Sequence, residues 1–124
     1  MILGTGIDII EVDRIAEKIG KNQGFRELVF SPKEIAYCEK QVHSHQHYAG
    51  RFAAKEALSK AIGTGLRHPV NLTYVTVAHD GLGKPFFQFH PELNQLISDK
   101  GITRHHLTIS DEIKMVCAFV ILEK

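Results

Sequence analysis

The residues best suited to chemistry lie in the stretch 51–65, where the acid Glu56 stands among cations that include Arg51 and Lys60. At 100° per residue, Glu56 and Lys60 fall on one side of a helix, opposite a broad and mostly alanine arc. Such a helix could hold a divalent metal and a phosphate, or it could simply pack closely while Glu56 and Lys60 pair across one turn. The arc consists of Ala53, Ala54, Ala57, Leu58, Ala61 and Ile62.

Gly63 predicts the end of this helix, because glycine tolerates the left-handed conformation that commonly closes a helix. Thr64 and Gly65 follow it, and they would leave backbone N–H groups free to approach a ligand. We therefore expect this short segment to contribute backbone contacts to a phosphate site.

A second acid, Asp8, lies in a segment with the pattern of a strand. Ile7 and Ile9 flank it, so Asp8 would be a carboxylate in a half-buried position, where an unpaired charge is costly. A cation such as Lys60 or Arg14 could compensate it. Alternatively, Asp8 and Glu56 suit a Mg²⁺ ion that keeps waters and takes its other ligands from a substrate phosphate.

Four segments together resemble one family, the holo-acyl-carrier-protein synthases, which are small 4′-phosphopantetheinyl transferases of bacterial fatty-acid synthesis. The segments occur in the family's order, and the resemblance spans nearly the whole chain. They are GIDIIEVDRI at 6–15, RFAAKEA with KAIGTG within 51–65, GKP at 83–85 and HLTISD at 106–111.

The resemblance implies transfer of the phosphopantetheine arm of coenzyme A onto a serine of apo acyl carrier protein, with release of adenosine 3′,5′-bisphosphate. Mg²⁺ would be the cofactor, and Asp8 and Glu56 match the acids that bind it. Lys60, one turn beyond Glu56, matches a lysine that contacts the pyrophosphate. These three residues are therefore the expected catalytic residues.

Further matches concern the binding of coenzyme A. The resemblance places the backbone of Gly63, Thr64 and Gly65 near the pyrophosphate. Arg51 and His106 match positions around the nucleotide and its 3′-phosphate, although structural hydrogen bonds would equally explain both residues.

The segment 43–47 carries three histidines, His43, His45 and His47, where the family pattern leads us to expect lysine or arginine. Imidazole is a weaker anion ligand near neutral pH, since its unperturbed pKa is about 6.5. Histidines in a loop without flanking acids are more often solvated surface than a metal site. No residue stands out as the general base for the carrier serine, for which Glu56 and a metal-bound water are the candidates.

A basic stripe is predicted near the N-terminus. Arg14, Lys18 and Lys21 fall at i, i+4 and i+7 of an expected helix, and Arg26 lies just beyond. Such a stripe is usually a solvated face. Acyl carrier proteins are acidic, however, and Arg14 matches the family's docking arginine, so we interpret the stripe as a surface for the carrier.

Length and composition indicate one globular domain, 1–124, since 44% of its 124 residues are hydrophobic and 23% are charged. A formal net charge of +1 gives no general attraction to nucleic acid or membrane. Cys38 and Cys117 lie far apart without a CxxC pattern, which argues against a zinc site or a disulfide framework. Without a signal or membrane-spanning pattern, we expect a cytoplasmic protein.

The pattern of elements predicts an α+β fold, in which helices cover one side of a small antiparallel sheet. Ser31, Pro32 and Glu34 give the clearest helix start, a capping box. The expected elements are a strand over 2–12, a helix capped by Asp13 and closed by Gly20, a helix to about Gln41, a loop at 43–47, the helix of Glu56, a hairpin of 72–78 with 85–89, a helix from His90 to Gly101, and paired strands at 105–110 and 114–122.

Apolar residues occupy both faces of the expected last strand, which therefore needs a second cover. The chain's own helices could supply that cover, whereas the family resemblance implies a homotrimer with active sites between subunits. Two other functions remain open at this point. A metal-dependent phosphoesterase could use the same acids, and a nucleotide-binding module would not need both of them.

Overall fold

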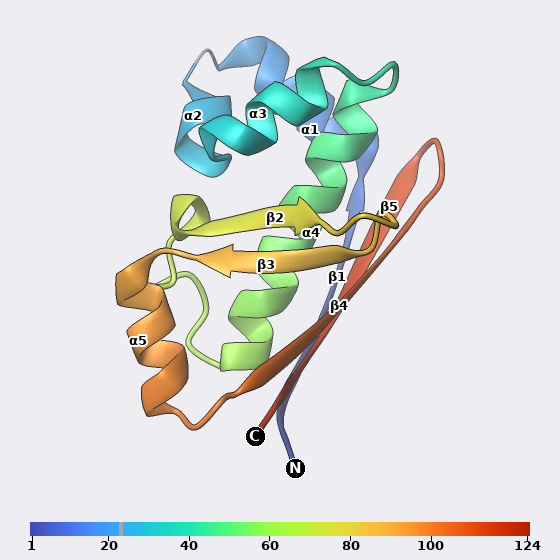
Figure 1. Ribbon diagram of the computed structural model, residues 1–124. Helices are drawn as coiled ribbons and strands as arrows, with labels where there is room; N and C mark the ends of the chain where they lie inside the picture. Colours follow the sequence, from blue (N-terminus) through green and yellow to red (C-terminus); the bar gives the residue numbers. More distant parts are fainter. Residues whose placement is uncertain (23) are drawn as a thin grey trace.

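The computed structural model describes residues 1–22 and 24–124, which form two antiparallel sheets and five α-helices (Figure 1). Strands β1, β5 and β4 make the larger sheet in that order, and β2 pairs with β3. The predicted α+β class is therefore confirmed. The elements are β1 Ile2–Glu11, α1 Val12–Lys21, α2 Phe25–Val29, α3 Pro32–Glu39, α4 Ser44–Ile62, a 3₁₀ turn Leu72–Tyr74, β2 Val75–His79, β3 Pro85–Phe89, α5 Pro91–Asp99, β4 Arg104–Asp111 and β5 Met115–Glu123.

Helix α4 is the centre of the fold. Figure 1 shows it crossing between the β2–β3 hairpin and the three-stranded sheet, with α1, α2 and α3 at one end of the molecule and α5 toward the other. Its alanine-rich arc is buried as predicted, because Ala53, Ala54, Ala57 and Leu58 have no exposed surface. The small side chains allow the three-stranded sheet to pack close to the helix axis.

The closest approach is between β1 and α4, and it depends on two glycines. A Cβ atom added to Gly4 would lie 2.0 Å from the carbonyl oxygen of Ala61, and one added to Gly6 would lie 1.9 Å from that of Ala57. Such distances are far shorter than any van der Waals contact, so these positions admit no side chain while the strand stays in place. The strand backbone therefore lies directly on the backbone of the helix.

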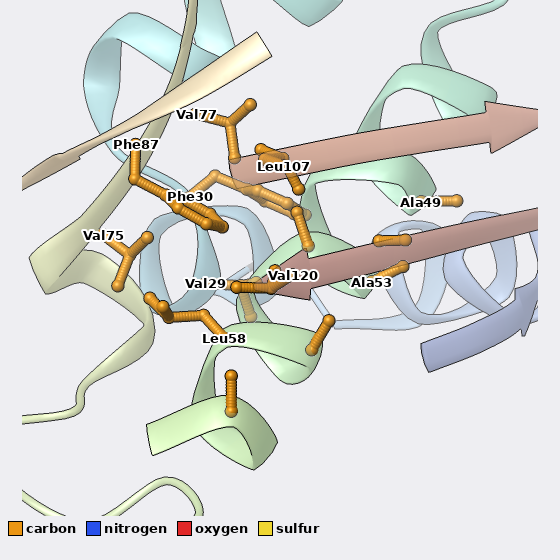
Figure 2. Close-up of a cluster of buried hydrophobic side chains, with 14 of the residues drawn as sticks. Val29, Phe30, Ala49, Ala53, Leu58, Val75, Val77, Phe87, Leu107 and Val120 are labelled. Atoms are coloured by element: carbon orange, nitrogen blue, oxygen red, sulfur yellow. The ribbon is translucent and has the colours of Figure 1, made fainter. Parts of the chain in front are cut away.

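The main core lies where α2, α4 and the two sheets meet. Figure 2 shows this region, in which Phe30 and Phe87 gather with shorter aliphatic side chains from β2, β4 and β5. Phe30 also contacts the fully buried ring of Tyr48, with ring centroids 4.8 Å apart. This core fixes the hairpin and the N-terminal helices relative to α4.

The face of the three-stranded sheet turned away from α4 remains exposed. Ile7 and Ile9 of β1 are 57% and 65% exposed, and Phe119 of β5, the pairing partner of Ile7, is 40% exposed. Residues of β5 on the inner face, from Val116 to Leu122 in alternation, are buried instead. The prediction that β5 is apolar on both faces is correct, and within the described residues one face lacks a cover.

Several local predictions differ from the structure. The first strand of the expected hairpin begins at Val75, because 72–74 form the 3₁₀ turn, and the helix expected to close at Gly20 runs to Lys21. The segment 44–47 was expected in a loop but forms the first turn of α4, because the helix begins at Ser44. Asp13 does not cap α1. That helix begins at Val12, whose N–H donates to the carbonyl of Lys114, so the strand pairing runs directly into the helix. None of the described helices is long and apolar enough to cross a bilayer.

Candidate active site on helix α4

Asp8 and Lys60 meet where β1 crosses α4. The Lys60 ammonium donates hydrogen bonds to the carbonyl oxygen of Ile7, at 2.9 Å, and to the Asp8 carboxylate, at 3.2 Å. The Asp8 side chain is 18% exposed, whereas that of Lys60 is 54% exposed. Lys60 therefore compensates Asp8, as one of the sequence alternatives proposed, and still presents its ammonium group to solvent.

Glu56 lies beside this pair and is partly buried. Burial raises the pKa of its carboxyl group, and the negative charge of Asp8 raises that pKa further, while Lys60 and Lys18 oppose the shift. No Glu56–Lys60 ion pair forms in residues 1–22 and 24–124, because Lys60 turns to Asp8 instead. Two carboxylates thus share one lysine, which leaves a site that favours an additional cation.

A metal ion at this site would have two protein ligands. The described residues contain no cluster of three or more acid, histidine or cysteine side chains able to hold a metal. Mg²⁺ commonly binds through one or two carboxylates and completes its octahedral shell with waters and substrate phosphates. The donor set of Asp8 and Glu56 therefore fits Mg²⁺, and it does not fit a zinc centre, which takes histidine or cysteine ligands.

The helix ends as predicted, with Gly63 in the left-handed conformation at φ +93°. The expectation that Thr64 and Gly65 leave their N–H groups free is wrong for Gly65. The N–H groups of Gly63 and Gly65 both donate to the carbonyl oxygen of Ser59. The last carbonyls of a helix lack intrahelical donors, so the closing turn consumes the N–H groups that would otherwise face a ligand. Thr64 donates its hydroxyl to the carbonyl of Gly65.

Arg51 lies on a different side of α4, about 140° around the helix from Glu56 at 100° per residue. Its guanidinium stacks over the ring of Tyr37 at 4.4 Å and lies 3.5 Å from Nδ1 of His79. It also donates to the backbone carbonyl of His47. We call Tyr37, Arg51 and His79 the arginine stack, since the Tyr37 and His79 rings are themselves stacked at 5.1 Å.

The arginine stack carries an uncompensated positive charge. Arg51 is 3% exposed and its buried Nε atom has no hydrogen-bond partner. Across the described chain, Arg26 and Arg104 pair with carboxylates, whereas Arg51 pairs with none. Burial and the nearby guanidinium both lower the pKa values of His47 and His79, so these imidazoles stay neutral near pH 7. A buried guanidinium with this environment suits an anionic ligand.

His106 lies on β4 at the edge of the larger sheet, apart from both groups. Its Nε2 atom is 2.5 Å from the Glu123 carboxylate on β5, and Arg104 lies 3.6 Å from the same carboxylate. The hydrogen bond from His106, followed by the charge of Arg104, lowers the pKa of Glu123. The structure thus distributes the predicted residues over three places: the Asp8–Glu56–Lys60 cluster, the arginine stack and the edge of β4.

The predicted basic stripe borders an open hollow of about 520 Å³ on α1. Lys21 pairs with Glu17 across one helical turn at 2.6 Å, and Lys18 lies over the Phe25 ring. Arg26 is 3.7 Å from Glu39, so its charge is partly compensated. The residues around the hollow are Arg14, Glu17, Lys18, Lys21, Asn22 and Phe25.

Comparison with known proteins places this geometry in a family. A model of the 4′-phosphopantetheinyl transferase superfamily matches residues 4–110. The chain belongs to this superfamily. A holo-[acyl-carrier-protein] synthase of Nitrosospira multiformis is 51% identical over 125 residues, with 100% of both chains covered.

Solved structures agree with this assignment. Holo-[acyl-carrier-protein] synthase from Neisseria meningitidis matches with a TM-score of 0.94 and 39% identity, over 100% of both chains. The enzyme from Bacillus anthracis, in complex with CoA (3′,5′-ADP), matches with a TM-score of 0.81 and 36% identity, over 98% of this chain and 96% of that one. The predicted family, fold and enzyme class of this phosphopantetheinyl transferase are therefore confirmed.

Sequence reasoning missed one buried pair in this phosphopantetheinyl transferase, Glu34 with Lys55. Their side chains are fully buried and 2.6 Å apart. Glu34 was predicted for the capping box, which it does form with Ser31. A buried role for Lys55 was detectable in principle, because it falls next to the apolar arc of α4 rather than beside Lys60. Its partner lies 21 positions earlier, however, and local patterns cannot pair residues so far apart.

Proposed function

We propose that this protein transfers the 4′-phosphopantetheine group of coenzyme A to a serine hydroxyl of apo acyl carrier protein and releases adenosine 3′,5′-bisphosphate. Family membership supports the reaction class, and the Asp8–Glu56–Lys60 cluster supports the chemistry. We treat 1–124 as one transferase domain, acting in the cytoplasm in bacterial fatty-acid synthesis. A phosphoesterase is not favoured, because residues 1–22 and 24–124 contain no denser acid cluster of the kind that hydrolysis would normally use.

Asp8 and Glu56 would hold Mg²⁺ in this proposal. The bound ion would neutralise pyrophosphate charge, which makes the phosphorus more electrophilic and the departing phosphate more stable. Lys60 would contact the pyrophosphate directly. Its half-exposed ammonium is anchored by the Ile7 carbonyl and can turn toward a pyrophosphate oxygen without losing its position on α4.

The arginine stack and His106 are proposed to bind the nucleotide end of coenzyme A. Arg51 would contact the 3′-phosphate with its buried guanidinium, and the neutral imidazoles of His47 and His79 could donate hydrogen bonds to the same group. Gly63, Thr64 and Gly65 would line the pyrophosphate path, with the Thr64 backbone as the donor that the helix end does not use.

The transfer reaction is tested by the intact mass of an apo carrier protein after incubation with coenzyme A and Mg²⁺. We expect one phosphopantetheine to be added. Asp8→Asn and Glu56→Gln keep the side-chain shapes but remove ligand charge, so each should slow transfer by about 100-fold or more. Asp99→Asn, at an exposed acid on α5, is the matched control and should leave the rate unchanged.

The result separates the alternatives. Degradation of the coenzyme without a mass gain of the carrier would indicate a phosphoesterase. If the coenzyme stays intact and the carrier gains no mass, the protein would be a binding module. Near-normal transfer in Asp8→Asn or Glu56→Gln would remove that residue from the metal site.

We propose that the basic stripe, Arg14, Lys18, Lys21 and Arg26, receives the acidic carrier at the hollow on α1. Lys18 connects this surface to the chemistry, because its charge lowers the pKa of Glu56. The exposed ion pairs would each contribute about 0.2–1 kcal/mol, so the stripe chiefly affects encounter rate and orientation.

Charge reversal tests this surface with Lys18 left unchanged, so that its charge effect on Glu56 is retained. Arg14→Glu combined with Lys21→Glu should raise the KM for the carrier roughly tenfold, through lost attraction and new repulsion, and leave the KM for coenzyme A nearly unchanged. High salt should weaken wild-type carrier binding similarly. Lys100→Glu, at the exposed residue that follows the last turn of α5, is the control. Equal effects on both KM values would rule out a surface specific for the carrier.

We propose a homotrimer in which the exposed sheet face of one subunit meets a neighbour. Ile7, Ile9 and Phe119 give this face its apolar character. A closed three-fold assembly would use one contact three times. It would also allow the Asp8–Glu56–Lys60 cluster of one subunit and the arginine stack of the next to hold the two ends of one coenzyme.

Sedimentation at micromolar concentration tests the assembly. We expect a trimer for the wild type, dissociation and loss of activity in Phe119→Glu, and no change in Leu82→Glu, at a 98% exposed position in the β2–β3 turn. Co-expressed Asp8→Asn and Arg51→Met chains should regain activity. Asp8→Asn and Lys60→Ala should not, because these residues meet within one chain. A stable, fully active wild-type monomer would contradict the shared site.

A further inference from the structure

The buried Glu34–Lys55 pair is the most completely bonded polar group in the described core. The Lys55 ammonium donates to the Glu34 carboxylate at 2.6 Å and to the carbonyl oxygens of Val29 and Leu72 at 2.7 and 2.9 Å. All three of its N–H bonds are therefore used. One side chain on α4 thus holds the end of α2 and the start of the 3₁₀ turn.

Glu34 extends these connections to α3 and β2. One carboxylate oxygen accepts from the Ser31 N–H at 2.9 Å as well as from Lys55, and the other accepts from the Val77 N–H at 3.0 Å. Val77 is in β2, where it lies opposite Phe87 of β3, and its N–H points away from that strand. The carboxylate therefore joins α3, α4 and β2, three elements that lie in the upper half of Figure 1.

The three elements joined at this point are the same three that form the arginine stack. Tyr37 follows Glu34 by three residues on α3, and Arg51 precedes Lys55 by four residues on α4, so each lies on the same helical face as its neighbour in the pair. His79 follows Val77 by two residues and shares its side of β2. Tyr37 and Arg51 are thus each one helical turn from a residue of the pair. His79 is one strand repeat from Val77, which is bonded to the pair.

Stability alone is a weak reason for this arrangement. Removing two charges from water is costly, and apolar side chains of similar volume often replace a buried ion pair without loss of stability. Hydrogen bonds are directional, however, and apolar contacts are not. The bonds of Glu34 and Lys55 fix the relative positions of three elements, and with them the aim of Arg51.

We propose that Glu34 and Lys55 are positioning residues that hold Tyr37, Arg51 and His79 in the geometry that grips a phosphate monoester. The inference rests on the proposed contact of Arg51 with the 3′-phosphate of coenzyme A. The proposal assigns an effect on ligand selectivity to two side chains that are not exposed to solvent.

The test is the binding preference for adenosine 3′,5′-bisphosphate over adenosine 5′-monophosphate, measured by calorimetry on the intact protein. Arg51→Met should reduce this preference roughly 10- to 100-fold, the effect of losing a hydrogen bond to a charged group. The double variant Glu34→Gln with Lys55→Met removes both charges and retains an acceptor for Val77. It should reduce the preference at least about tenfold, because a shift of ~1 Å can cost that much.

Two further variants separate positioning from stability. Glu34→Asp keeps the charge but shortens the side chain, so it cannot reach Lys55 and Val77 together, and it should lose preference even if the double variant does not fold. Leu93→Ala, in the buried part of α5, should lower the thermal midpoint while leaving the preference unchanged.

A wild-type preference in folded Glu34→Asp or in the double variant would overturn the proposal. So would an equal loss of preference in Leu93→Ala, since the effect would then follow stability. An unchanged preference in Arg51→Met would reject the stack as the phosphate contact, whereas the transfer reaction itself is judged separately by the mass of the carrier protein.

Discussion

The contact between the backbones of β1 and α4 is the constraint on which the rest of the molecule depends. Gly4 and Gly6 lie so close to the carbonyl oxygens of Ala61 and Ala57 that no side chain fits between strand and helix. Two residues further along the strand, this contact places Asp8 beside the polar side of α4, where Lys60 reaches it. The placement of Asp8 beside Lys60 is therefore a direct consequence of a packing requirement between small residues.

The same helix serves a second purpose on its other side. There α4 presents Arg51 to Tyr37 and His79, and one turn later it presents Lys55 to Glu34. The carboxylates and the buried guanidinium thus leave the helix in different directions. One chain therefore holds these opposite charges apart on two sides of the same helix.

Much of this was predictable from the sequence, because helix caps, small-residue arcs and motif residues are local signals. The capping box at Ser31 and Glu34 and the left-handed Gly63 were found in this way. Contacts between distant segments were not predictable. The glycines of β1 gave no sign of their contact with α4, and the helical turn at 44–47 was obscured by its histidines, which have weak helix propensity.

The central claim is that packing of β1 on α4 brings Asp8 and Glu56 together. The most direct test is a carbon NMR titration of the Glu56 carboxyl group in metal-free buffer. The account predicts a pKa above the ordinary 4.5 in the wild type, a lower value in Asp8→Asn, where the like charge is lost, and a higher one in Lys60→Met. A Glu56 pKa that is unchanged by both substitutions would contradict it.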